Sequence, residues 1–393
     1  MSNSPAVIAK QVNQAKLSAI KEMALLSAKV EGASSLAWGL PSFPTPENIR
    51  RSVTEQLDQD TDIGKYTLPD GISELRTLVA EKHFRDTKVK VDPATQVVIS
   101  AGNMQALSTL MKVVLNPGDE IIVTDPGFAS HYQQIKLNGG TPVPWPLQES
   151  KGWQLNPEIL PGLISERTKA IVLVSPSNPT GTVFSKAALL RTAEIAVQHN
   201  ILIFLDDPYS QFLYENHNTF FNLASEASIK EHLVYCFSFS KCHAMSGWRL
   251  GYMVMPEALK EQVIKVHDAN VICAPRISQI AGVAALQQAA PHLEAFENIL
   301  SKRRDLICQR LDALKHVFEY QRPDGAYYVF PKILVEAKDC WDFSLSLLHK
   351  AKVTVTPGSA FGPSGEMHVR MAYCVDEDTI DLSFDRMENY FGK

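Results

Sequence analysis

The stretch VYCFSFSKCHAMSGWRLGYM, residues Val234–Met253, begins like a buried strand and changes character at Ser238. Lys241 follows three residues later, and Arg249 follows after a further eight. A lone lysine at a strand end can simply reach solvent. Ligands of open α/β sheets bind beyond the carboxyl ends of the strands. The hydroxyl, amine and guanidinium of this stretch are therefore candidates for a binding site at the edge of a sheet.

Short apolar runs recur around this stretch and alternate with helix-like segments. The expected strands are 97–100, 120–125, 170–175, 201–206, 233–238 and 249–255, and the expected helices are 103–115, 130–138 and 186–200. Continuous apolar strands separated by amphipathic helices favour a parallel sheet covered on both faces. The sequence thus predicts an α/β fold whose strand ends bring polar residues to one edge.

The last third of the chain has an α+β pattern. A long charged amphipathic segment, ENILSKRRDLICQRLDAL, precedes the strand-like GAYYVFPKI and a second helix near 343–350. The N-terminal segment has the pattern of an amphipathic helix and is followed by WGLPSFPTP. We expect a large domain over residues 45–285, and a small domain made of residues 1–44 and 286–393.

The composition excludes several function classes. The 393 residues are 45% hydrophobic and 21% charged, with a net charge of −5, which gives no basic footprint for nucleic acid or an anionic membrane. The six cysteines are scattered without metal-site spacing, and no apolar run suits a signal peptide or a membrane span. Dinucleotide and Walker fingerprints are absent from the sequence. We expect a cytoplasmic protein with reduced thiols and no metal.

Further motifs follow one another along almost the whole chain: GLPSFPTP, KYTLPDGISELR, SAGNMQAL, DPGF, PSNPTGTVFS, DDPYSQF, SFSKCHAMSGWRLGY, GAYYVFP and PGSAFGPSGEMHVRMAY. In this order and at these separations they resemble the class I and II aminotransferases, fold-type I enzymes that use pyridoxal 5'-phosphate. The resemblance implies a large domain with a mostly parallel, mixed sheet flanked by helices, and a smaller α+β domain. It also implies a ping-pong reaction that moves an amino group from an L-amino acid to a 2-oxo acid.

The resemblance also implies a cofactor site. Lys241 would hold pyridoxal phosphate as a Schiff base and move the substrate Cα proton. Asp206 would pair with the pyridine nitrogen, while Tyr209 and Asn178 would bind the 3′ oxygen. The remaining positions are Ser238 and Arg249 for the phosphate, backbone N–H groups of Gly102, Asn103 and Met104 beside it, Phe128 stacked on the ring, and Tyr66 reaching the phosphate of a neighbouring subunit.

Two of these assignments carry conditions. The SAGNMQAL turn departs from the family's G-S-Q pattern, so Asn103 can still donate but Met104 offers only its backbone. The role of Tyr66 requires a homodimer with shared active sites. An ordinary surface tyrosine is the alternative.

The substrate side of the site rests on the same resemblance. Arg370 would clamp the α-carboxylate, with Asn178 beside it. Gly39 would line the entrance, where Trp38 and Leu40 would meet the substrate side chain. Arg276 leaves two alternatives, which are a ligand for a dicarboxylate side chain in the partner's site or a salt-bridged interface residue. The amino donor stays open between aromatic, large apolar and acidic amino acids.

Two rival functions remain beside transamination. The same residues would support a β-lyase or a decarboxylase, because the reaction depends on which Cα bond lies perpendicular to the cofactor ring. A regulator that binds ligand without turnover is the second rival. We expect the chain to lack the additional DNA-binding domain of such regulators, since little sequence precedes Gly39 and no basic surplus is present.

Overall fold

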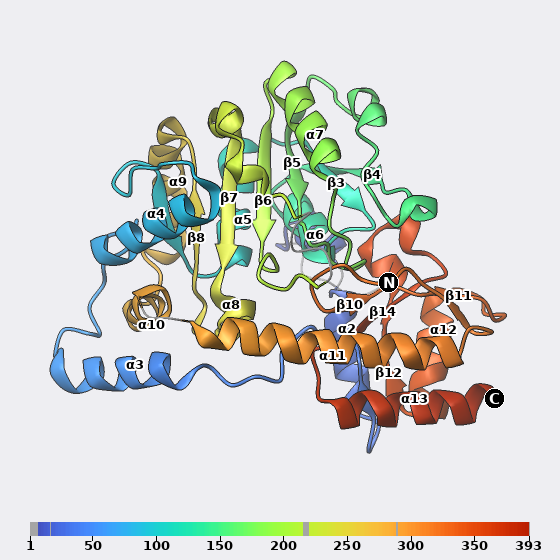
Figure 1. Ribbon diagram of the computed structural model, residues 1–393. Helices are drawn as coiled ribbons and strands as arrows, with labels where there is room; N and C mark the ends of the chain where they lie inside the picture. Colours follow the sequence, from blue (N-terminus) through green and yellow to red (C-terminus); the bar gives the residue numbers. More distant parts are fainter. Residues whose placement is uncertain (1–6, 16, 215–219, 288–289, 393) are drawn as a thin grey trace.

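A computed structural model describes residues 7–15, 17–214, 220–287 and 290–392 (Figure 1). At its centre is a seven-stranded sheet in the order β2-β8-β7-β6-β5-β3-β4. The strands are β2 (Val97–Ser100), β3 (Glu120–Asp125), β4 (Thr141–Pro146), β5 (Thr168–Leu173), β6 (Leu202–Asp207), β7 (Leu233–Ser238) and β8 (Gly251–Val254). Strand β8 is antiparallel to both neighbours, and the other pairs are parallel.

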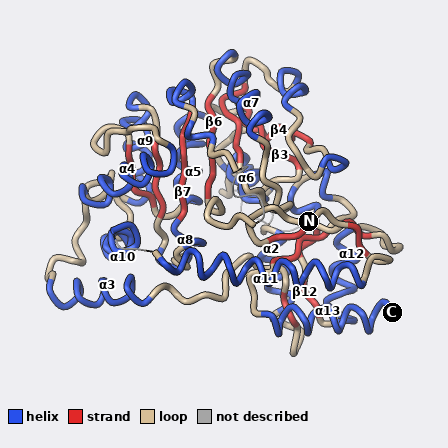
Figure 2. The backbone as a smooth tube through the Cα atoms, in the orientation of Figure 1, coloured by secondary structure: helices blue, strands red, loops and turns tan. Residues whose placement is uncertain are grey.

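Both faces of this sheet are buried, as its continuous apolar strands predict. In β7, Val234 and Cys236 belong to one apolar cluster, whereas Leu233, Tyr235 and Phe237 belong to another on the opposite face. Figure 2 shows the strands lying between helices. The helices of this part are α3 (Glu47–Gln59), α4 (Ser73–Thr87), α5 (Asn103–Val114), α6 (Ala129–Leu137), α7 (Lys186–Gln198), the short α8 (Phe239–Cys242), α9 (Glu257–Val271) and α10 (Arg276–Gln287).

The six predicted strands and three predicted helices of this region are all present. The strands at 97–100, 120–125 and 233–238 have the predicted bounds, and the other elements have shifted ends. The strand expected at 249–255 starts later, because Arg249 adopts a left-handed backbone with φ of 54°. Strand β4 was not predicted. Its sequence, TPVPWP, contains three prolines, which lack a backbone donor and are tolerated only where one strand edge is unpaired. Strand β4 lies at such an edge.

The C-terminal part is built from small sheets and three helices. Helix α11 (Pro291–Ala313) runs from beside α10 toward α13 (Glu377–Phe391), with which it is in contact (Figure 1). The remaining elements are β9 (Phe318–Glu319), β10 (Tyr328–Val329), β11 (Lys332–Ile333), α12 (Cys340–Ser346) with a π-helical turn over Leu347–Ala351, β12 (Val353–Thr354), β13 (Thr356–Pro357) and β14 (Val369–Ala372). The strand expected over GAYYVFPKI is thus two short strands, separated by Phe330 and Pro331.

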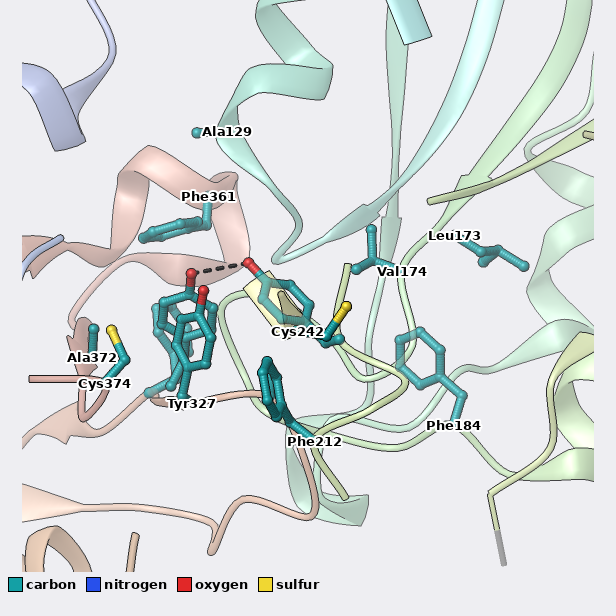
Figure 3. Close-up of a cluster of buried hydrophobic side chains, with 14 of the residues drawn as sticks. Ala129, Leu173, Val174, Phe184, Phe212, Cys242, Tyr327, Phe361, Ala372 and Cys374 are labelled. Carbon is teal, nitrogen blue, oxygen red and sulfur yellow. Dashed lines mark hydrogen bonds between the residues drawn. The ribbon is translucent and has the colours of Figure 1, made fainter. Parts of the chain in front are cut away.

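The N-terminal segment packs against this C-terminal part. Its described residues form α1 (Lys10–Gln14) and α2 (Ala19–Ser27), so the single expected helix is interrupted, and residues 1–6 and 16 of that prediction lie outside the described chain. Strand β1 (Ser34–Ser35) pairs in parallel with β12. Phe212, Tyr327 and Phe361 come from distant segments and gather in one buried cluster (Figure 3). This contact fixes the C-terminal part against the carboxyl edge of the large sheet.

Candidate active site

A cavity of about 310 Å³ opens at this carboxyl edge, between the large sheet, helix α2 and the C-terminal part. Twelve of the sixteen predicted site residues line it: Trp38, Gly39, Asn103, Met104, Phe128, Asn178, Asp206, Tyr209, Ser238, Lys241, Arg249 and Arg370. They come from segments up to 332 positions apart, from Trp38 to Arg370. The sheet edge brings them together because its parallel strands all end on the same side.

Lys241 lies in α8, just beyond the end of β7. Its Nζ donates a hydrogen bond of 2.7 Å to the carbonyl oxygen of Gly39. Burial lowers the pKa of Lys241 to about 8, and the positive charges of Arg370 and Arg249 act in the same direction. Its amine is therefore available in the neutral, nucleophilic form at a much lower pH than that of a solvated lysine.

Asp206 lies near the carboxyl end of β6 and is held by two neighbours. Asn103 Nδ2 donates to Asp206 Oδ1 at 2.8 Å, and His131 Nε2 lies 3.0 Å from Asp206 Oδ2. Asn103 Nδ2 also lies 3.0 Å from the carbonyl oxygen of Cys236. The side chain of Asn103 therefore orients a carboxylate instead of extending toward an anion, and only its backbone N–H remains for the predicted phosphate contact.

Sequence reasoning missed His131. It sits three residues after Phe128, and the two rings meet edge-on with centroids 5.2 Å apart. The helical spacing after DPGF was the signal that could have identified it, because residues three apart share one face of a helix.

Arg370, on β14, is almost fully buried and points its guanidinium at two acceptors. Its Nη1 donates to Asn178 Oδ1 at 3.1 Å, and its Nη2 donates to the carbonyl oxygen of Ala37 at 2.6 Å. The guanidinium carbon lies 4.4 Å from the centroid of the Tyr328 ring. Its Nε has no hydrogen-bond partner among the described residues. A buried guanidinium with an unsatisfied donor suits an anionic ligand.

Tyr209 and Tyr328 connect the large sheet to the C-terminal part. Their hydroxyl oxygens lie 2.9 Å apart, and the rings meet edge-on. Burial raises the pKa of Tyr209 well above its usual range, so its hydroxyl keeps its proton. Tyr328, in the GAYYVFP segment, is a site residue that the sequence motifs did not identify. A Cβ on Gly39 would overlap the Tyr328 hydroxyl, so only glycine leaves room at this position.

Arg249 lies beside two backbone carbonyls, Gly102 and other polar groups of the cavity wall, including the Ser238 hydroxyl. The guanidinium donates to the carbonyl oxygens of Ser246, at 2.8 Å, and Ala101, at 3.4 Å. A Cβ on Gly102, whose φ is 81°, would lie 2.5 Å from Arg249 Nη2. Ser238 Oγ accepts from the backbone of Ser240, which leaves the Ser238 hydroxyl proton free to donate elsewhere. Together with the N-terminus of α5, these groups provide donors of the kind that suits an anionic ligand.

The other four predicted residues do not line the cavity, and one of them, Leu40, is 42% exposed. Gly102 is just behind the wall, beside Arg249. Tyr66 is 75% exposed and does not line the cavity. Arg276 Nη2 forms an ion pair of 2.7 Å with Asp60, and Nη1 donates to the carbonyl oxygen of Asp62, so its charge is already matched within this chain.

The described residues offer neither a metal cluster nor a membrane-spanning helix. No group of three or more histidine, cysteine or acidic side chains in the described ranges has a metal-binding arrangement. Among the helices of the described chain, none combines the length and apolar character needed to cross a bilayer.

Comparisons with known proteins agree with this geometry. The family described as aminotransferase class I and II matches residues 33–386. An aspartate aminotransferase of Pyrococcus horikoshii is 35% identical over 97% of this chain and 96% of its own length. Aromatic-amino-acid aminotransferase 2 of Thermococcus litoralis is 33% identical over 94% of this chain and 95% of its own length.

The similarity extends to three dimensions. A solved structure of a Thermus thermophilus aspartate aminotransferase mutant superposes with a TM-score of 0.91 at 32% identity, covering 97% of this chain and 99% of that one. The predicted fold class, an α/β fold with a mixed sheet flanked by helices, is confirmed.

Proposed function

The chain belongs to the class I and II aminotransferases and depends on pyridoxal phosphate, and from this premise we propose how its cavity binds the cofactor and an amino acid. The family, the activity and the cofactor expected from the sequence are confirmed. The roles of individual residues are our proposal. The observation that carries it is that Lys241, Asp206 and Arg370 line one cavity.

The residues present fit the cofactor. The close approach of Arg249 to Gly102, with the Ser238 hydroxyl nearby, supports a phosphate position. Asp206, oriented by Asn103 and His131, supports a position for a protonated pyridine nitrogen. Pyridoxal phosphate would supply an aldehyde that condenses with amines and a ring that withdraws electrons from the substrate Cα.

Lys241 is the proposed base. Its buried Nζ lies beside the carbonyl oxygen of Gly39 and accepts the proton from the substrate Cα, then returns it later in the cycle. A pKa of about 8 suits this task, since a general base works best when its pKa is near the working pH. Phe128, at the start of α6, is proposed to hold the cofactor ring in plane by stacking.

Arg370 is the proposed ligand of the substrate α-carboxylate, with Asn178 alongside. The existing bond from Nη1 to Asn178 Oδ1 fixes the orientation of the guanidinium before the substrate arrives. Tyr209, kept protonated by burial, donates toward the 3′ oxygen of the cofactor. Such fixed groups accelerate the reaction by holding Cα–H near Lys241.

Both dicarboxylic and aromatic amino acids are proposed as substrates. Relatives that match nearly the whole chain are named for aspartate and for aromatic amino acids. The half-exposed indole of Trp38 at the cavity wall supports the aromatic class. The pairing of Arg276 with Asp60 argues against Arg276 as the ligand for an acidic side chain.

The assembly is proposed to be a homodimer in the cytoplasm. Tyr66 and Leu68, exposed to 75% and 69%, do not line the cavity, which supports a role against a second copy. The pairing of β1 with β12 supports the division into a large domain of residues 45–285 and a small domain of 1–44 and 286–393.

The absorbance spectrum of the purified protein loaded with pyridoxal phosphate tests this function. Amino acids are added without any oxo acid, and the cofactor band is followed through conversion to the pyridoxamine form. The wild type should convert stoichiometrically with its donors, whereas Lys241→Ala should not turn over. The exposed lysine of α9 supplies a matched control, Lys265→Ala, which should behave as wild type.

Two results would contradict the proposal. A persisting cofactor band with accumulating ammonia would indicate a lyase. Full turnover by Lys241→Ala would remove Lys241 as the base.

A further inference from the structure

Lys21 is a cation of the cavity wall that the proposed mechanism does not use. It lies on α2, and its side chain lines the same cavity as Lys241 and Arg370. Its Nζ sits 4.3 Å from the centroid of the Trp38 ring. Across the described ranges, the Lys21 ammonium makes no ion pair or side-chain hydrogen bond with another residue. A cation–π contact of this kind holds an ammonium in place without neutralising it.

The other cations of the wall are already engaged. Lys241 donates to Gly39, Arg370 donates to Asn178 and Ala37, and Arg249 donates to backbone carbonyls at the proposed phosphate position. Of the described residues that line the cavity, Asp206 is the one acidic side chain, and Asn103 and His131 contact it. Among the described residues of the cavity lining, Lys21 is therefore the cation whose side chain donates no hydrogen bond to the protein.

The position of Lys21 relative to the reacting groups is set by consecutive residues. The Gly39 carbonyl oxygen accepts from Lys241 Nζ, and Trp38 is the residue immediately before Gly39 in the chain. A substrate whose Cα lies at Lys241 and whose α-carboxylate lies at Arg370 can direct its side chain past Gly39 toward Trp38. Lys21 stands over the face of that indole.

We infer that Trp38 and Lys21 form the side-chain subsite and that Lys21 binds the second carboxylate of a dicarboxylic amino acid or oxo acid. The inference rests on the proposed function, because it takes the substrate Cα to lie at Lys241. The indole of Trp38, 49% exposed, offers an apolar surface to an aromatic or large apolar side chain in the same subsite. A carboxylate attracts the ammonium more strongly than the indole face does, so one subsite accepts both classes.

Binding of unreactive analogues to the cofactor-loaded enzyme tests the inference without turnover. Maleate supplies two carboxylates, and 3-phenylpropionate supplies one carboxylate and a ring. By isothermal titration calorimetry, Lys21→Met should weaken maleate binding about tenfold and change 3-phenylpropionate binding by less than about twofold. Lys21→Arg should retain most of the maleate affinity.

Lys29→Met is the matched control. It removes the same charge from an exposed position just beyond α2 that does not line the cavity, so it should leave both affinities unchanged. Equal maleate affinity in wild type and Lys21→Met would overturn the inference, as would a parallel loss of both ligands.

Failure of the proposed function would be recognised separately. A wild type whose cofactor band no amino acid converts would refute the proposed function. A selective loss of maleate in Lys21→Met would still support Lys21 as the carboxylate ligand.

Discussion

At the scale of single residues, the site depends on one buried amine. Among the described residues, the Lys241 amine donates a hydrogen bond to the carbonyl oxygen of Gly39, and burial lowers its pKa from 10.5 to about 8. Because the charged form is disfavoured by desolvation, the neutral amine predominates above about pH 8. The environment of the residue therefore activates it before any ligand binds.

The reactivity of Lys241 should accordingly depend on pH with a midpoint near 8. We expect the rate at which the apoenzyme combines with pyridoxal phosphate to rise between about pH 7 and 9 and then level off, since the neutral amine is the nucleophile. Stopped-flow absorbance measures this rate. A rate that kept rising to pH 10 would show that the amine has the pKa of a solvated lysine. Free lysine provides the control.

His131 is the second residue whose role can be tested. It lies 3.0 Å from Asp206 Oδ2 and is buried, so its removal leaves one side of that carboxylate unsupported. We expect His131→Ala to lower kcat/KM about tenfold or more, because misplaced reacting groups react slowly. His131→Asn should recover part of the loss. Steady-state kinetics measures this effect, and the exposed His199→Ala is the control. Unchanged kinetics in His131→Ala would show that Asn103 alone is enough to orient the Asp206 carboxylate.

At the scale of elements, helix α4 and the C-terminal cap of α8 carry buried neutral histidines. Burial lowers the pKa of His83, on α4, to about 4 and that of His243 to about 3. His243 Nδ1 lies 2.9 Å from His292 Nε2 at the start of α11. These buried rings are neutral in the folded protein. As the pH falls, they therefore take up protons only in the unfolded chain, until the pH approaches their folded-state pKa values.

Stability should therefore fall as the pH drops below about 6.5, the unfolded value. With a folded pKa near 4, His83 should lower the free energy of unfolding by about 2 kcal/mol between pH 7 and pH 5, since the unfolded state binds a proton that the folded state excludes. Urea unfolding of wild type and His83→Gln at both pH values measures this difference. The free energy of unfolding of the variant should fall by about 2 kcal/mol less than that of the wild type between the two pH values. An identical pH dependence would contradict the prediction.

At the scale of the whole molecule, strand β3 meets the C-terminal part at Asp125. The Asp125 carboxylate accepts from the backbone and the hydroxyl of Ser364 at 2.8–3.2 Å. Gly362 has a φ of 124°, and a Cβ there would overlap Asp125 Oδ1. The two parts of the molecule thus approach at a point where only glycine fits.

Gly362→Ala should destabilise the protein by about 3 kcal/mol, through backbone strain and displacement of Asp125. Gly118→Ala is the matched control, because Gly118 also has a positive φ, 89°, but has no atom within 4 Å of the added Cβ. Gly118→Ala should lower the free energy of unfolding by only about 1 kcal/mol. Urea midpoints compare the two variants. Equal losses would show that contact with Asp125 adds nothing to the strain.

Hybrid dimers test whether Tyr66 acts across subunits. A dimer of one Tyr66→Ala chain and one Lys241→Ala chain contains one site with both residues intact if Tyr66 serves the partner. Such hybrids, purified with two different affinity tags, should regain about half of the wild-type activity per dimer, whereas each homodimer is impaired. If Tyr66 acts within its own chain, no site is complete and the hybrid remains as impaired as the homodimers.

The sequence by itself determined the order and type of most elements. Apolar runs such as 233–238 can be stable only when buried on both faces, so their alternation with amphipathic helices already implies a covered sheet. It also placed Lys241, Asp206 and Ser238 at strand ends, where parallel strands converge. Strand β4 escaped prediction because its three prolines suppress the strand pattern, and the edge that accommodates them is a property of the sheet.

Only the tertiary structure decided which distant side chains meet. The contacts of His131 and Asn103 with Asp206, and of Tyr328 with Tyr209, join segments 75 to 119 positions apart, which local patterns do not encode. The same folding paired Arg276 with Asp60 and put Lys21 over Trp38. The depressed pKa of Lys241 also arises there, because desolvation exists only once the chain has closed around the amine.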